Sequence, residues 1–284
     1  MSTLAPFHAC FAIAIAAISL PALAQYQNSS SPGIAIHDGV LQNQQQAQRS
    51  PTRNLELTLG AQRLTNGFGN WRDTTLRGAY EIGSHVLQGE LSAKREFNES
   101  GVFAGISDTY TFNADWYGSL SIGAGDGAFY LPKVRVDGAL YKKWLDKRNL
   151  VTSVGLGYYD APAGNTDRNL NFGATYYFDA PFIAEAGIRF NRSNPGSIST
   201  HQQFVALTYG HVGQYLITGR YGEGGEGYQT IAQNTQLVNF QSREASLAWR
   251  HWITVNSGFL ISAEAYRNPN YQRRGINVGL FTQF

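Results

Sequence analysis

Charged side chains recur at every second position within short apolar segments of this chain. Glu56 lies between Leu55 and Leu57, and Arg77 follows Leu76 in the same alternation. A period of two residues places the charges on one face of a β-strand and the apolar side chains on the other. Nine ionisable residues are the candidates for this polar face: Glu56, Arg77, Glu90, Lys94, Arg135, Glu185, Arg189, Arg220 and Glu264.

This polar face has two interpretations. If the strands close into a membrane barrel, the charges line a lumen and contact a hydrophilic solute. Alternatively, they form ion pairs across strands that fill and stiffen the interior. Acids and bases on these faces are nearly balanced, so the sequence predicts no ring of one sign, which a strongly selective ion channel needs.

A hydrolytic site is the second chemistry that the sequence suggests. His201, His211 and His251 border predicted connections, where a rim enzyme acting on lipid or lipopolysaccharide would hold a base beside a nucleophile. None of them lies in a G-x-S-x-G sequence or another hydrolase motif. We therefore predict no catalytic residue.

The glycine-rich stretch from Gly222 to Gly227 is predicted to be an outer loop. A phosphate-binding loop needs a helix behind it, whereas Gln, Asn and Thr follow here. Glu223 and Glu226 do not provide a complete calcium ligand set. We expect neither a cofactor nor a metal.

The last nine residues, 276–284, indicate which fold carries these side chains. Their apolar face, interrupted by Thr282, consists of Ile276, Val278, Leu280 and Phe284. An apolar strand at the edge of a soluble sheet would recruit other chains, whereas a barrel pairs its last strand with its first. Counting the earlier segments, we predict an all-β fold. It is a transmembrane antiparallel up-and-down β-barrel of about fourteen strands, with twelve or sixteen as alternatives.

The connections and the tryptophans agree with this barrel. Short connections such as Gly83-Ser84 alternate with longer ones such as Asp126–Lys133 and Glu223–Leu237, as in outer-membrane barrels. An even strand number would put both termini of the barrel on the periplasmic side. Five tryptophans lie near segment ends, where interfacial girdles are expected: Trp71, Trp116, Trp144, Trp249 and Trp252.

Composition narrows the class of protein, and the N-terminal pattern indicates where the barrel begins in the chain. The protein has 284 residues and a net charge of +2, which indicates neither a nucleic-acid tract nor an acidic tail. No run of about 18 apolar residues occurs, so a helical membrane protein is excluded. Residues 1–24 have the pattern of a cleaved secretory signal. Residues 25–53 form a polar, Gln- and Ser-rich periplasmic leader, and residues 54–284 form the barrel. Cys10 would be lost with the signal.

Several short motifs together resemble the YaiO family of bacterial outer-membrane barrels. They are Leu64-Thr65-Asn66-Gly67, Trp71-Arg72, Asp108 after Phe103-Ala104-Gly105, and Tyr271-Gln272-Arg273-Arg274-Gly275 before Gly279-Leu280. The final strand is also similar to the C-terminal signal read by the outer-membrane barrel assembly machinery, through Asn277, Gly279 and Phe284. The resemblance implies an outer-membrane location. It also implies that Asp108, which breaks the alternation of Val102–Phe112, is constrained by structure or function.

We therefore expect an integral outer-membrane barrel that is a passive conduit or accessory barrel for envelope solutes or surface glycans. The alternatives are a rim-located enzyme acting on lipid or lipopolysaccharide, and a closed structural anchor. The expected partners are outer-membrane lipid and lipopolysaccharide, the barrel assembly machinery, and an envelope glycan or small solute. No nucleic acid is expected.

Overall fold

The computed structural model describes residues 53–162 and 164–284. The predicted signal sequence and the predicted leader up to residue 52 lie outside this part of the chain. The described residues form a closed barrel of fourteen antiparallel strands, which confirms the predicted fold and strand number. The strands are β1 (Arg53–Leu64), β2 (Asn70–Ile82), β3 (His85–Glu96), β4 (Glu99–Thr111), β5 (Trp116–Gly125), β6 (Val134–Trp144), β7 (Leu150–Asp160), β8 (Thr166–Tyr177), β9 (Phe182–Asn194), β10 (Ile198–His211), β11 (Tyr215–Ala232), β12 (Thr235–Trp252), β13 (Ser257–Arg267) and β14 (Gln272–Gln283).

The two-residue period separates the faces of the wall. Apolar side chains such as Leu57, Leu156 and Leu280 point outward and are 45%, 66% and 65% exposed. Their neighbours along each strand point inward and are mostly polar or glycine. An exposed apolar belt of this kind is stable in contact with lipid hydrocarbon. No helix among the described residues is long and apolar enough to cross a membrane.

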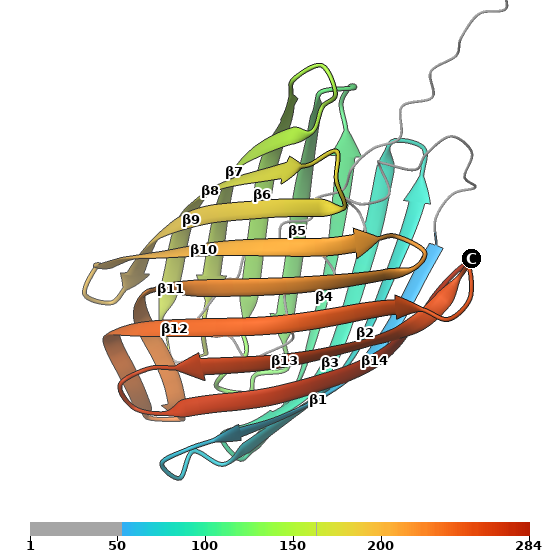
Figure 1. The fold of residues 1–284 in the computed structure, drawn as a ribbon. Coiled ribbons are helices and arrows are strands. Elements are labelled where there is room, and N and C mark those ends of the chain that lie inside the picture. The colour runs from blue at the N-terminus through green and yellow to red at the C-terminus, as the bar shows by residue number, and fades with distance from the viewer. Residues whose placement is uncertain (1–52, 163) are drawn as a thin grey trace, which may run out of the picture.

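The barrel closes between its first and last strands (Figure 1). Leu57 lies opposite Leu280 across this seam. The Arg53 N–H donates to the Phe284 carbonyl at 3.2 Å, and the Phe284 N–H donates to the Arg53 carbonyl at 3.0 Å. The first and last residues of the barrel, Arg53 and Phe284, therefore lie at the same rim, which we call the terminal rim. We call the opposite one the loop rim.

The loop rim differs from the prediction in one connection. The loop at 126–133 is present as expected, between β5 and β6. The predicted loop Glu223–Leu237, with its glycine-rich start, is wrong because β11 and β12 run through it and leave only residues 233–234 as the turn. Backbone pairing, seen for example between Tyr228 and Val238, needs no apolar alternation, so the side-chain pattern does not reveal these strands.

The extended part of β11 and β12 leaves the barrel wall. The pairing of β10 with β11 ends at Gln202 and Gly224, and that of β12 with β13 ends at Arg243 and Arg267. Residues 225–242 thus pair only with one another. We call them the mouth hairpin.

The girdle prediction is correct for three tryptophans and wrong for two. Trp116, Trp144 and Trp249 belong to the outward face near the terminal rim. Trp71 and Trp252 point inward and are 1% and 6% exposed. Phase along the strand decides the face that a side chain occupies, whereas nearness to a strand end does not.

Asp108 lies on the outward face close to the terminal rim. Its carboxylate is 2.7 Å from Nδ1 of His85 on β3, and the ring of Tyr110 lies 4.7 Å from the imidazole. This pair accounts for the break in the alternation of β4.

Candidate solute pathway

All nine charged candidates lie on the inner face, opposite the apolar stripe. The most extensive ion-pair network is centred on Glu56 of β1. Glu56 binds Arg250 of β12 and lies 3.5 Å from Arg77 of β2. Arg77 in turn binds Glu90 of β3 at 3.0 Å. The guanidinium of Arg250 also stacks over the ring of Phe281 at 4.1 Å.

The other inner charges also have partners of opposite sign. Arg135 binds Asp137 at 2.5 Å, Arg220 lies 3.7 Å from Glu244, and Glu264 lies 3.8 Å from Arg273. Lys94 interacts electrostatically with Glu90, Glu185 with Arg220, and Arg189 with Asp137. Pairing within and between strands thus explains the balance of acids and bases.

A second stretch of inner wall, on β8 and β9, is rich in amides rather than charges. The Asn171 amide donates to Asn169 at 2.6 Å, and the Asn191 amide donates to Asp167 at 3.2 Å. Gly157 on β7 makes room for this patch, because a Cβ there would collide with Asn169. The wall here can donate and accept hydrogen bonds with little net charge.

Several buried polar atoms on the inner face lack a hydrogen-bond partner among the described residues. Both amide atoms of Gln62, one carboxylate oxygen of Asp73 and the amide oxygen of Asn171 are examples. These side chains are 3%, 6% and 5% exposed. Buried polar atoms are almost always hydrogen-bonded to protein or water, so a water molecule or a solute group at this wall would complete their hydrogen bonding.

The inner face near the terminal rim is apolar. Tyr117 and Tyr141 stack with ring centroids 4.5 Å apart, and Trp252 packs on Phe281 at 5.1 Å. Together with Leu260 they belong to one buried cluster that extends over inner positions from β5 to β14. This layer limits the lumen at the end where the chain enters the barrel.

The loop 126–133 folds into the lumen from the loop rim. The Asp126 carboxylate accepts hydrogen bonds from the backbone N–H groups of Val102 and Ala128, at 2.9 and 3.3 Å. The Tyr130 hydroxyl donates to the Lys94 carbonyl at 2.9 Å. Gly101 on the inner face of β4 receives the loop, since a Cβ there would lie 2.6 Å from Ala128.

The mouth hairpin covers the lumen from the opposite side. Gln229 donates to the Tyr271 hydroxyl at 2.5 Å, and Tyr228 donates to the Pro195 carbonyl. Leu237 packs on the buried cluster that contains Trp71. Because of these contacts, the hairpin lies across the loop rim and does not project from it.

Glu226 anchors this hairpin. It is fully buried, and one carboxylate oxygen accepts a hydrogen bond from Tyr266 at 2.7 Å. Burial raises the pKa of Glu226 to about 8, although hydrogen bonds from Ser242 and Tyr266 act in the opposite direction. The charge of Glu244 raises the pKa further, and the positive charge of Arg273 lowers it.

A row of aromatic rings links the two coverings. Phe129 of the loop lies 6.1 Å from Phe97, which lies 4.9 Å from Trp71. Trp71 lies 6.4 Å from Tyr271 beside the mouth hairpin. The lumen is therefore polar in the middle, apolar at the terminal rim and lined with aromatic rings at the loop rim.

Sequence reasoning missed several inner residues at the ends of strands. Asp73 continues the inner phase of Arg77, and Arg273 shares the inner phase of Asn277, so extending the alternation finds both. Tyr266 likewise shares the inner phase of Glu264, and Glu226 shares that of Arg220, but Glu226 was assigned to a loop because β11 was predicted to end before it.

The three residues of the predicted assembly signal lie at the seam. Asn277 is buried and donates to Ser262 at 3.2 Å. A Cβ on Gly279 would lie 2.6 Å from the Leu57 carbonyl oxygen. Phe284 is 66% exposed beside the start of β1.

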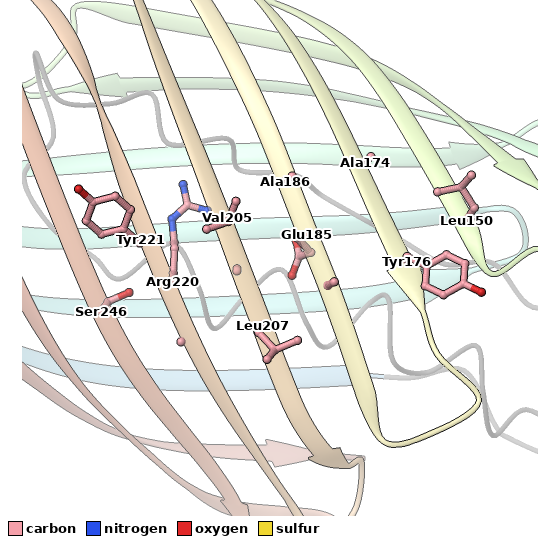
Figure 2. Close-up of a pocket in the computed structure, with 13 residues that line it drawn as sticks. Leu150, Ala174, Tyr176, Glu185, Ala186, Val205, Leu207, Arg220, Tyr221 and Ser246 are labelled. Atoms are coloured by element: carbon pink, nitrogen blue, oxygen red, sulfur yellow. The ribbon is translucent and has the colours of Figure 1, made fainter.

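An apolar groove of about 740 Å³ crosses the wall at β7 to β12 (Figure 2). Small residues such as Ala184 and Gly219 lie in it between larger ones such as Tyr176 and Tyr221. Most of its lining belongs to the outward apolar face, although Glu185 and Arg220 also border it. The groove faces hydrocarbon and is no part of the lumen.

The histidines considered for hydrolysis all belong to the outward face. His201 lies on β10 toward the loop rim, and His211 ends the same strand at the terminal rim. His251 packs beside Trp249 and Phe259, with ring centroids 5.5 and 5.3 Å away. Within the described chain, no three His, Cys, Asp or Glu side chains could together hold a metal ion.

An apolar exterior, a closed antiparallel wall and a polar interior define a membrane β-barrel. The chain belongs to the YaiO family, whose profile, described as the YaiO membrane beta barrel domain, matches residues 52–229. No curated protein matches the sequence.

Solved structures share the fold at low sequence identity. The CymD monoaromatic hydrocarbon channel has a TM-score of 0.56 and 8% identity, over 84% of this chain and 89% of that one. The P. putida toluene transporter TodX has a TM-score of 0.51 and 9% identity, over 82% and 89%. A bacterial polysaccharide outer membrane secretin has a TM-score of 0.51 and 9% identity, over 82% and 98%.

Proposed function

We propose that this protein is an outer-membrane conduit, or the barrel of a larger conduit, for hydrophilic envelope solutes or surface glycans. One observation carries the proposal. Buried hydrogen-bonding atoms of Gln62, Asp73 and Asn171 belong to inner-face side chains and have no partner among the described residues. Water or a hydroxyl-bearing solute in the lumen would satisfy them.

The chemistry of the wall favours an uncharged polar solute. The similar structures bear names that refer to an aromatic hydrocarbon, toluene and polysaccharide, so their shared fold does not choose the solute. In this barrel the inner charges are paired, and the patch around Asn169 and Asn171 offers amides. Amides donate to and accept from hydroxyl groups equally well.

The location and export of the barrel are part of the proposal. The first and last residues of the barrel lie at one rim, and an even number of strands would place that rim in the periplasm. We infer cleavage of residues 1–24 during export and recognition of Asn277, Gly279 and Phe284 by the barrel assembly machinery.

The conduit is tested by single-channel recording of the protein purified from membranes, in a planar bilayer. We expect steady conductance and entry of neutral sugars into proteoliposomes. Arg77→Gln should change the conductance, because Arg77 faces the lumen and binds Glu90. Arg168→Gln removes the same charge from the outward face and should leave conductance unchanged. A correctly folded barrel that neither conducts nor admits sugars, even after the hydrogen bonds that hold the loop 126–133 and the mouth hairpin are removed, would overturn the proposal.

A closed anchor barrel is the second candidate. It is favoured by the apolar layer at the terminal rim and by the two segments that cover the loop rim. The same recordings decide between the two candidates. An anchor stays silent even when the hydrogen bonds that hold the loop 126–133 and the mouth hairpin are removed, whereas a gated conduit opens.

A further inference from the structure

Arginines form a continuous band on the outward face at the loop rim. Six neighbouring strands, from β12 through β13, β14, β1 and β2 to β3, each contribute one exposed arginine. In spatial order they are Arg243, Arg267, Arg274, Arg63, Arg72 and Arg95. We call this set the arginine band.

The strand register brings these arginines together. Arg243 lies directly opposite Arg267, and Arg63 lies directly opposite Arg274. Another directly opposed pair joins Arg72 to Arg95. Side chains in such positions have Cβ atoms about 4.5–5.5 Å apart.

Diagonal neighbours complete the band. Arg267 lies opposite Gln272, two residues before Arg274, and Arg63 lies opposite Asn70, two residues before Arg72. Diagonal neighbours of this kind are about 7–8 Å apart, within reach of long side chains. Each of the six strands contributes an arginine, so the row of positive charges is continuous from β12 to β3.

The arginine band lies at the edge of the apolar belt that is nearer the loop rim. On β13 the outward residues toward the loop rim are Ile261, Ala263, Ala265 and then Arg267. On β14 Arg274 immediately precedes the outward Ile276. The guanidinium groups therefore lie at the boundary between lipid hydrocarbon and lipid headgroups.

Protein contacts do not explain this arrangement. Like charges directly opposite each other destabilise a sheet. In the described chain only Arg243 of the band has an acidic partner, Glu223 at 3.6 Å. The side chains of the remaining five make no hydrogen bond or ion pair with described residues. Such a cluster is stable when an anion from outside the chain lies between the guanidinium groups.

The opposite rim lacks this feature on the same strands. There the outward positions next to the apolar run include Ile82 on β2, His85 on β3, His251 on β12 and Phe284 on β14. The single arginine, Arg53 on β1, stacks on Tyr80 at 5.0 Å. The arginine band is thus specific to one membrane surface rather than a general property of strand ends.

We infer that the arginine band binds phosphate groups of outer-leaflet lipid, as found on the phosphorylated sugar headgroup of lipopolysaccharide. Each directly opposed arginine pair offers several N–H donors to one phosphate, which can accept them in pairs. The inference rests on the outer-membrane location proposed above and is independent of whether the lumen conducts.

The test compares lipid binding by two double variants. Arg63→Gln with Arg274→Gln removes one opposed pair from the band, whereas Arg53→Gln with Lys142→Gln removes the same charge from the outward face of the terminal rim. Phosphatidylcholine nanodiscs contain either bisphosphorylated lipid A or the same lipid stripped of phosphate. Bound lipid is measured by native mass spectrometry.

We expect the band variant to bind bisphosphorylated lipid A about tenfold more weakly, and the terminal-rim variant to bind it like the wild type. Phosphate-free lipid should bind all three proteins equally. In detergent without phosphorylated lipid, the band variant should melt at a temperature equal to or above that of the wild type, because a repulsive pair is gone.

Three results would overturn the inference. They are unchanged lipid binding by a folded band variant, an equal loss in the terminal-rim variant, and stabilisation of the wild type by inorganic phosphate as strong as that by lipid A. The third would mean a site for a soluble anion rather than a lipid surface. Conductance recordings on the same variants keep this test separate from that of the conduit.

Discussion

Arg250 on β12 reaches past β13 and β14 to bind Glu56 on β1, and both side chains are almost fully buried inside the barrel. The two residues are 194 positions apart in the chain. The contact spans β13 and β14 on the inner side of the barrel. It also connects the Arg77–Glu90 pair to the aromatic ring of Phe281.

Replacing Glu56 by Leu should destabilise the barrel by about 3–5 kcal/mol, because it leaves Arg250 buried without its carboxylate. Arg77 keeps Glu90 as a partner. The double variant Glu56→Leu with Arg250→Leu should recover much of the loss, since no uncompensated charge remains. Urea unfolding in detergent, followed by tryptophan fluorescence, measures both. Equal stability of the single and double variants would refute the pairing argument.

Gly279→Ala should weaken the seam between β14 and β1. The added Cβ would lie 2.6 Å from the Leu57 carbonyl oxygen, a backbone atom that no side-chain rotation can move. We expect a cost of about 1–3 kcal/mol and slower folding into lipid. Gly89→Ala is the matched control, because nothing lies within 4 Å of a Cβ there. If both variants fold equally well, close approach at the seam is not what Gly279 provides.

Docking of the mouth hairpin should depend on pH through Glu226. Burial raises the pKa of Glu226 from 4.5 to about 8, so the docked hairpin retains a proton that a released hairpin would lose. Docking is therefore most favourable below about pH 4.5 and weakens as the pH rises toward 8. Hydrogen exchange of residues 225–242 should accelerate over that range.

Glu226→Gln is the variant that tests this mechanism. A neutral amide keeps a hydrogen-bonding group near Tyr266 but cannot ionise, so exchange in the hairpin should lose its pH dependence once the intrinsic amide rate is removed. Glu81→Gln, at the terminal-rim end of β2 and away from the hairpin, should retain it. An unchanged pH profile in the Glu226 variant would assign the effect to another group.

Asp126→Ala should release the loop 126–133 from the lumen. The variant loses the carboxylate that accepts hydrogen bonds from the Val102 and Ala128 N–H groups, a local cost of about 1–3 kcal/mol. We expect larger conductance and faster hydrogen exchange in the loop. Asp146→Ala, in a turn at the terminal rim, removes the same charge and should change neither. A loop that stays protected after Asp126→Ala would show that Tyr130 and its neighbours hold it alone.

The strand pattern predicted much of this architecture because side-chain direction alternates along every strand. Glu56, Arg77 and Glu264 were assigned to the inner face from their immediate neighbours alone. The prediction for Trp71 and Trp252 is wrong because it rests on nearness to a segment end instead of on this alternation.

The sequence by itself determined the all-β barrel of about fourteen strands, its apolar exterior and its polar interior, since a period of two residues needs no information from distant parts of the chain. Only the tertiary structure decided which charges meet, where β11 and β12 leave the wall, and how the arginines of six strands form one band. These features depend on register and on contacts across the lumen between residues far apart in the chain, and no local pattern encodes either.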